Sequence, residues 1–544
     1  MNTSFTGWDY LIFAVYAIAL VSVGFWVSRG KKGEEKSAED YFLASKSLPW
    51  WAIGASLIAA NISAEQFIGT SGSGFAGGLA IASYEFMAAL TLIIVGKFFL
   101  PIFIKQGIYT IPEFVERRFS TNLKTILAVF WICLFVFVNL TTVLFLGGKA
   151  LDTILGSGDG SMLLPCMLCL AAVAAAYSLY GGLSAVAWTD VLQVVLLVIG
   201  GLITTFIALY YVTPQHSVIE GAKHIYEAAG SHFDLILEPS NKEYSNMPGI
   251  YMLIGGLWIA NIYYWGFNQY IIQRTLAAKS LEESQRGIIF AAFLKLLIPF
   301  IVVVPGIIAY VMYTEGLFDA QSAFEVAGSS SLNNDNAYPW LIRTFVPTGL
   351  KGLVVAALAA AIVSSLASML NSTSTIFTMD IYKPYMNPNA SQKTLVNVGR
   401  LTAGVALIIA CFIAPLLGGI DQVFQYIQEY TGLVSPGILA VFLMGLFWKK
   451  ANNKGAIWGV IVSIPIALAL KLAPGLGMPF IDQMFYTTLL SMAVIFMVSL
   501  STNPSEDDPK AINLTQDMFK TDSVFNICSY VICILLAIIY AIFW

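Results

Sequence analysis

The sequence predicts an all-α polytopic membrane protein with about fourteen transmembrane helices. Of the 544 residues, 58% are hydrophobic and only 11% are charged, and the mean hydropathy is +0.77. Apolar segments of about 20 residues, long enough to cross the hydrocarbon core as helices, recur along the whole chain. Two of these segments are interrupted by polar residues and glycines, although an ordinary spanning helix keeps its backbone hydrogen bonds unbroken.

The apolar segments give the expected spans in chain order. We expect them near residues 8–28, 48–73, 78–104, 123–150, 161–182, 187–212, 250–272, 288–312, 350–375, 397–416, 422–447, 455–471, 480–500 and 523–543. The first segment lacks the basic region and the small-residue cleavage site of a signal peptide, so we expect it to be a span.

Basic residues occur in alternate loops and indicate the orientation. They are Arg29, Lys31, Lys32, Lys36 and Lys46, then Arg117, Arg118 and Lys124, then Arg274, Lys279 and Arg286, then Lys383, Lys393 and Arg400, then Lys449, Lys450 and Lys454, and finally Lys510 and Lys520. Because short cytoplasmic loops are enriched in Lys and Arg, the first loop is expected to be cytoplasmic and both termini periplasmic.

The first interrupted segment reads AANISAEQFIG over residues 59–69 and lies in the span that begins near Trp50. The second reads GGLWIANIYYWGFNQ over residues 255–269, five spans later. An odd number of spans reverses the direction through the membrane, so this spacing favours an inverted repeat with an ion or substrate site between the two breaks. The alternative is a kinked helix whose polar groups bind neighbouring helices.

Two charged side chains, Glu85 and Lys295, lie within apolar spans. Each costs about 2.5–3.5 kcal/mol at a helix centre, so such groups are expected to face a cavity or one another. The alternatives are a purely structural ion pair and a Lys295 side chain that reaches the cytoplasmic surface. Gln428 adds a polar group to the eleventh span.

The ninth span carries oxygen ligands suited to a hard cation. Ala361, Ser364 and Ser365 follow one another as i, i+3 and i+4 and therefore share a helix face. Together with carbonyls freed near Ala59 and Ile62, the two hydroxyls would make a small oxygen cage for sodium. The alternative is that these small residues only pack helices together.

Several stretches resemble the sodium:solute symporter family, namely residues 59–74, 84–85, 188–190, 261–273, 291–295, 356–372 and 425–437. The resemblance implies the LeuT-type fold with a 5+5 inverted repeat and two broken helices. It divides the chain into a peripheral first helix and cytoplasmic loop (1–47), a first five-helix repeat (48–212), an outer loop (213–249), a second five-helix repeat (250–447) and three peripheral helices (448–544).

The resemblance also implies roles for individual residues. A hexose would be bound by Gln66, Glu85, Asn261, Lys295 and Gln428, with Tyr264 stacking on the ring as an inner gate and Tyr84 and Phe424 forming an outer lid. Sodium would be bound by Ala59, Ile62, Ala361, Ser364 and Ser365, with Asp190 on the ion exit path. The chemistry agrees, because amides both donate and accept hydrogen bonds, as sugar hydroxyls do.

Three positions depart from patterns within that family. Ala88 stands where the galactose carriers have a serine, and Thr70 stands where they have a bulky thioether. Members that couple two sodium ions have an acid matching Asp190 and a hydroxyl two residues after the serine pair. Here that second position is Ala367, so we expect one sodium per sugar.

The sequence therefore predicts sodium-coupled symport of a hexose, galactose or glucose, in a bacterial inner membrane. The alternatives are symport of myo-inositol, a sialic acid or proline, and a sugar-gated channel or sensor. An enzyme is not expected, because no nucleophile–base set, metal cluster or phosphate loop is evident. The expected partners are sodium, a sugar and the lipid bilayer, with no organic cofactor and no nucleic acid, and a homodimer is left open.

Overall fold

The computed structural model describes residues 5–28, 37–156, 160–325, 332–418, 422–473, 477–503 and 507–544. Within these ranges the chain is helical almost throughout and forms no strand, which confirms the all-α class. Arg29, Lys31, Lys32 and Lys36, on which the predicted orientation partly rests, lie outside the described residues.

The first half of the chain forms eleven α-helices in the described residues, and the first polar break follows the third of them. They are α1 (Gly7–Ser28), α2 (Ala38–Leu43), α3 (Trp50–Asn61), α4 (Ser71–Gly77), α5 (Ser83–Ile94), α6 (Leu100–Gln106), α7 (Ile111–Arg118), α8 (Thr121–Cys133), α9 (Thr141–Leu155), α10 (Leu163–Tyr211) and α11 (Val218–Ala228).

The second half begins with the other broken segment. Its helices are α12 (Gly249–Ile254), α13 (Gly256–Ile262), α14 (Gln269–Leu276), α15 (Leu281–Thr314), α16 (Ala320–Phe324), α17 (Ala337–Phe345), α18 (Leu350–Ile376), α19 (Gln392–Ile413), α20 (Val423–Phe447), α21 (Asn453–Leu472), α22 (Phe480–Thr502) and α23 (Ser523–Ile542).

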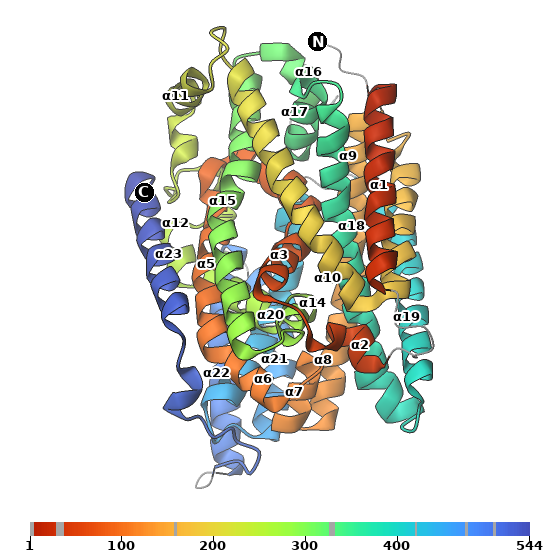
Figure 1. Cartoon of the computed structure of the whole chain (residues 1–544). Coiled ribbons are helices and arrows are strands. Elements are labelled where there is room, and N and C mark those ends of the chain that lie inside the picture. Colours follow the sequence, from red (N-terminus) through yellow and green to blue (C-terminus); the bar gives the residue numbers. More distant parts are fainter. Residues whose placement is uncertain are drawn as a thin grey trace.

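The helices form one elongated bundle with α23 along one edge and α1 and α19 along the other (Figure 1). Helix α18 lies at the centre of the bundle. In the segment Leu350–Met386, which contains α18, 94% of the residues in the most apolar stretch are buried, whereas only 17% are buried in the corresponding stretches of α1 and α23. Helix α10 packs on α18 and α3, and α15 packs on α3, α4 and α5. The outer helices therefore present their apolar surface to lipid, and the polar site lies inside the bundle.

Among the described residues, 11 helices are long and apolar enough to span a membrane, or 12 if one bent pair counts as a span. The expected number of about fourteen is larger because α3 has only 12 residues and the segment Leu163–Ala176 falls short of a full crossing. The two spans expected at 161–182 and 187–212 are joined as α10, with Gly182 at φ 66° between them. A side chain at Gly182 would clash with the Tyr41 carbonyl, since its Cβ would lie 2.4 Å from that oxygen.

The two ends of the bundle carry different parts of the chain. The start of α1, the end of α23 and α11 lie toward one end, whereas α2, α6 and α7 lie toward the other (Figure 1). Both ends of the described chain thus reach the same side of the bundle. Which side faces the cytoplasm stays a prediction from the basic loops.

Candidate functional site

The first polar break lies directly after α3. Ile62 is extended (φ −80°, ψ 98°), so the carbonyls of the last turn of α3 lie beyond the helical hydrogen-bond ladder. Ser63 then starts the next helical segment, because its hydroxyl accepts the Glu65 N–H (3.1 Å) and its carbonyl accepts the N–H of Gln66 (3.2 Å). The break therefore exposes helix-end carbonyls and turns polar side chains inward.

The second break lies around α13. The backbone bends by 82° between the helical segments Lys242–Ile254 and Gly256–Phe267. Asn268 is extended (φ −81°, ψ 121°), and its carbonyl accepts the Ile271 and Ile272 N–H groups at the start of α14. Both interrupted segments of the sequence therefore carry backbone interruptions, as predicted.

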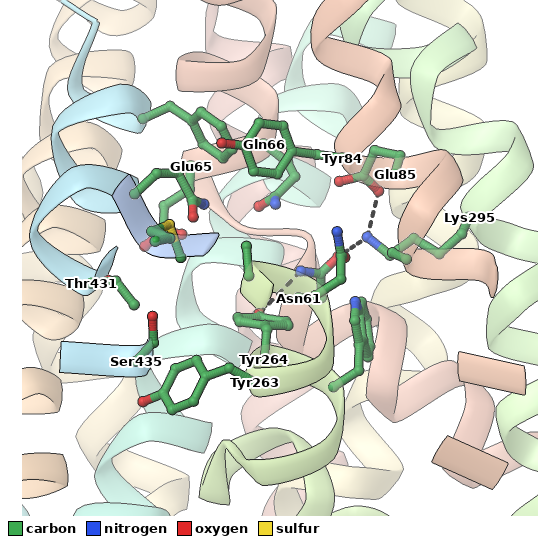
Figure 2. A pocket seen from close by; sticks show the side chains of 17 residues that line it. Asn61, Glu65, Gln66, Tyr84, Glu85, Tyr263, Tyr264, Lys295, Thr431 and Ser435 are labelled. Atoms are coloured by element: carbon green, nitrogen blue, oxygen red, sulfur yellow. Dashed lines mark hydrogen bonds and ion pairs between the residues drawn. The ribbon is translucent and has the colours of Figure 1, made fainter. Parts of the chain in front are cut away.

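A cavity lies between the two broken segments, and Figure 2 shows its lining. The volume open to the centre of a water molecule is about 60 Å³. All the side chains expected to bind or cover the sugar line this cavity, namely Gln66, Tyr84, Glu85, Asn261, Tyr264, Lys295, Phe424 and Gln428. They come from the segment after α3, from α5, from α13 and the π-helical turn Tyr263–Phe267 that follows it, from α15 and from α20, so five separate parts of the chain converge on one site.

A chain of hydrogen bonds connects the charged and aromatic groups of the cavity (Figure 2). The ammonium of Lys295 donates to the Glu85 carboxylate and to the side-chain amide oxygen Oδ1 of Asn61. Asn61 Nδ2 donates to the Tyr264 hydroxyl (3.0 Å), which also accepts from Tyr270 (2.7 Å). Because Lys295 is 1% exposed, it does not reach the surface, and the alternative of snorkelling is excluded.

Other polar groups of the cavity are not paired. Among the described residues, the buried amide oxygen of Gln66 and the hydroxyls of Tyr84 and Ser435 have no hydrogen-bond partner. Buried polar groups are normally bonded, so unpaired ones that line a cavity fit a ligand rich in hydroxyl groups. The Lys295 ammonium also lies 5.0 Å from the ring centroid of Trp265, on the cavity wall.

Aromatic rings close the cavity on two sides. Tyr84 and Phe424 meet edge to face with centroids 5.5 Å apart. Tyr264 contacts Trp265 and Tyr270 in the same manner, at 5.2 and 5.8 Å. Aromatic edges on opposite sides of a polar cavity suit a closed, water-poor compartment.

The groups expected to bind sodium lie at the junction of α3 and α18. Ala59, Ile62, Ala361, Ser364 and Ser365 are all fully buried. The Ser365 hydroxyl donates to the Ala60 carbonyl at the end of α3 (3.1 Å). The Ser364 hydroxyl donates its proton to Asp190, so its oxygen lone pairs are free to face a cation.

Asp190 is the centre of a buried ion-pair network. Its carboxylate accepts from Ser56 (2.5 Å) and Ser364 and pairs with the Arg274 guanidinium (3.4 Å). Arg274 also donates to the Ser56 carbonyl (3.0 Å) and to Ser368. The prediction that Arg274 lies in a cytoplasmic loop is wrong, because α14 carries it into the bundle, where it is 1% exposed and neutralises Asp190.

The sequence analysis did not predict that Asn61, Glu65, Thr431 and Ser435 line the cavity. Asn61 was seen only as part of the first break, although it joins Lys295 to Tyr264. Thr431 and Ser435 follow Gln428 by three and seven residues and share its face of α20, and this helical spacing was the available signal. Glu65 gives no such signal, because its direction depends on the π-helical turn Glu65–Thr70.

Comparison with known proteins gives three findings. A family model described as the sodium:solute symporter family matches residues 41–463. The chain is 64% identical to a sodium/glucose cotransporter of Vibrio parahaemolyticus over 539 residues, 98% of each chain. It is 34% identical to a sodium/myo-inositol cotransporter of Canis lupus familiaris over 503 residues, 87% of this chain and 68% of that one.

The fold matches a solved structure of a Na+-coupled sialic acid symporter in a substrate-bound outward-open state. The TM-score is 0.79, with 93% of this chain and 100% of that chain covered. At 24% sequence identity, this likeness concerns the fold alone.

Proposed function

The chain belongs to the sodium:solute symporter family, and from that premise we propose that it moves a hexose into the cell together with sodium by alternating access. The observation that carries the proposal is the polar cavity between the two broken helical segments, with aromatic rings on two of its sides. A transporter needs such a compartment at the middle of the membrane, where it can open to either side in turn.

The lining suits a neutral sugar. Glu85 and Lys295 neutralise one another, so the cavity holds strong hydrogen-bonding groups without a net charge from this pair. Gln66, Asn261 and Gln428 supply amides that both donate to and accept from hydroxyl groups. Lys295 is the one cationic side chain in the described lining and already pairs with Glu85, so a carboxylate substrate, such as a sialic acid or proline, would find no free cation and is therefore disfavoured.

The gates follow from the aromatic contacts. Tyr84 and Phe424 separate the cavity from the outer side, and the Tyr264 ring lies under the sugar on the inner side, held by Asn61 and Tyr270. Opening to the cytoplasm requires Tyr264 to leave its two hydrogen-bond partners, so sugar release is coupled to breaking them.

Sodium would bind at the end of α3, between the carbonyls of Ala59 and Ile62 and the oxygens of Ala361, Ser364 and Ser365. This site joins the broken first segment to α18, so the ion would hold α3 in the position that also orients Asn61 and Gln66. Sodium binding and sugar binding then favour the same state, which is the basis of coupling.

We propose a stoichiometry of one sodium per sugar. Ala367 lacks the hydroxyl that a second ion would need, and Asp190 already accepts from Ser56, Ser364 and Arg274. The Arg274 guanidinium thus supplies the positive charge that a second sodium would otherwise bring to Asp190. The 5+5 inverted repeat, the peripheral first helix and last three helices, and the periplasmic termini are part of the same proposal.

Uptake of labelled glucose into proteoliposomes tests the proposal, with an inward sodium gradient against equal sodium on both sides. We expect accumulation above the outside concentration only with the gradient. Competition by galactose, myo-inositol, a sialic acid and proline identifies the substrate, and dominance of myo-inositol would replace the hexose. Passive equilibration that ignores the gradient would instead indicate a channel or sensor.

A further inference from the structure

A second cavity lies far from the sugar site, where α3, α15 and α23 begin. Its volume is about 350 Å³, within the range of ligand-binding pockets. Its walls are Ile289, Phe290 and Phe293 of α15 and Val524, Phe525 and Cys528 of α23, with Trp50 of α3 at one end. We call this cavity the α15–α23 groove.

The groove is apolar and opens toward lipid. Phe525 is 1% exposed and Ile289 5% exposed, so they form its floor, whereas Val524 is 52% exposed at its edge. Helix α23 lies at the edge of the bundle and packs on α15 and α5 (Figure 1). A groove of this kind between spanning helices is filled by hydrocarbon rather than by water.

Charged groups lie at the mouth of the groove. Arg286 donates from Nη2 and Nε to the Asp522 carboxylate at 2.8 and 3.1 Å, and its side chain is 43% exposed. Glu282 lies one helical turn before Arg286, on the same face of α15, and is exposed. Arg286 therefore lines the groove as a partly exposed cation that is paired with Asp522, and Glu282 adds an exposed carboxylate one turn nearer the start of α15.

We propose that the α15–α23 groove binds one phospholipid with an ethanolamine headgroup. One acyl chain lies along Phe290, Phe293 and Phe525, the phosphate binds Arg286, and the primary ammonium binds Glu282. A choline headgroup fits less well because its trimethylated nitrogen has no N–H to donate to a carboxylate. A phosphatidylglycerol headgroup fits less well because it has no cation for Glu282.

The occupant would touch a junction that matters for transport. The Trp50 N–H donates to Glu283 of α15 (2.6 Å), and the Trp50 ring meets Phe290 at 5.6 Å. Gly54 allows this close approach, since a Cβ there would lie 2.6 Å from Phe290 Cδ1. A lipid held against Phe290 therefore supports α3, the helix that ends at the polar break. Under the proposed orientation, this lipid lies in the cytoplasmic leaflet.

Binding can be tested without any transport assay. The purified full chain is placed in vesicles that contain phosphatidylethanolamine with a photoactivatable acyl chain, and the crosslinked peptides are mapped by mass spectrometry. We expect crosslinks at Phe293 and Cys528, with about tenfold less when phosphatidylcholine or phosphatidylglycerol carries the same chain, as expected for loss of one charge-assisted hydrogen bond.

Two pairs of variants give matched controls. Cys528→Trp fills the groove, whereas Ile527→Trp places the same ring on the neighbouring position, which is 62% exposed to lipid. Glu282→Gln removes the carboxylate proposed for the ammonium, whereas Glu227→Gln removes an exposed carboxylate on α11. We expect Cys528→Trp to abolish groove crosslinks and Glu282→Gln to erase the preference for ethanolamine, with both controls unchanged.

Three results would overturn the proposal. One is equal crosslinking by all three headgroups in the wild-type chain. Another is an unchanged crosslinking pattern in Cys528→Trp. The third is a preference for ethanolamine that survives Glu282→Gln. Because the experiment measures lipid binding, its result does not depend on whether the chain transports a sugar.

Discussion

The Glu85–Lys295 pair allows the role of a buried ion pair in stability to be separated from its role in substrate binding. The two side chains are 5% and 1% exposed and contact one another in the lining of the cavity between the two broken segments. We consider Glu85→Gln, Lys295→Met and the double variant. Each single change leaves the other charged side chain of the pair buried without its partner, whereas the double change removes both charges together.

The expected magnitudes differ between the two roles. Removing one partner of a buried ion pair costs about 3–5 kcal/mol of stability, whereas replacing both by uncharged groups is close to neutral. A charged hydrogen bond to the sugar contributes about 1.5–3 kcal/mol, equal to about 10- to 150-fold in affinity. The double variant is therefore expected to regain the stability of the wild type without regaining its sugar affinity.

The assay combines thermal unfolding in detergent with sodium-driven uptake over a range of sugar concentrations. The matched control is the exposed Glu220–Lys223 pair on α11, which is expected to show no measurable coupling and normal uptake. Wild-type uptake by the double variant would refute the reasoning, because the pair would then serve the fold alone.

Three further outcomes follow from the same contacts. Tyr264→Phe keeps the ring but loses its hydrogen bonds, so sugar uptake is expected to fall by about tenfold, whereas Tyr264→Ala is expected to abolish uptake. Equal uptake by the two variants would show that the ring is not a gate. Ser365→Ala is expected to raise the sodium concentration that gives half-maximal uptake. Ser463 is a buried serine of α21, and Ser463→Ala is expected to leave this concentration unchanged. Equal shifts in the two variants would contradict a sodium site at Ser365. Arg274→Gln leaves the Asp190 carboxylate buried without its guanidinium and is expected to lower stability by about 3–5 kcal/mol in thermal unfolding; an unchanged melting temperature would show that the pair is not needed.

Much of the site could be predicted from sequence because lipid makes polar residues costly. Glu85, Lys295 and Gln428 each lie in an apolar span, where an unpaired charge or amide has no water to bind. That cost makes such residues stand out one at a time. The same reasoning identified both interrupted segments, because glycines and asparagines at membrane depth break the usual helical pattern.

The pairing of residues could not be predicted, because it depends on packing between distant helices. Arg274 reads as a loop residue since it follows an apolar span, and only the position of α14 beside Asp190 shows otherwise. Asn61 is one polar residue among several in the first break, and its central place depends on α13 and α15 lying beside it. The number of spans also depends on where α3 and α10 bend.

The most direct test of the central claim is a reversal measurement in proteoliposomes, with the sodium, sugar and voltage gradients set independently. The voltage is varied until the net sugar flux falls to zero. One charge moving through 100 mV contributes about 2.3 kcal/mol, which balances a sugar gradient of about fifty-fold, and two charges would square that factor. We predict the balance expected for one sodium per sugar. A balance that fits two sodium ions would contradict the stoichiometry, and a flux that ignores sodium and voltage would contradict coupled transport itself.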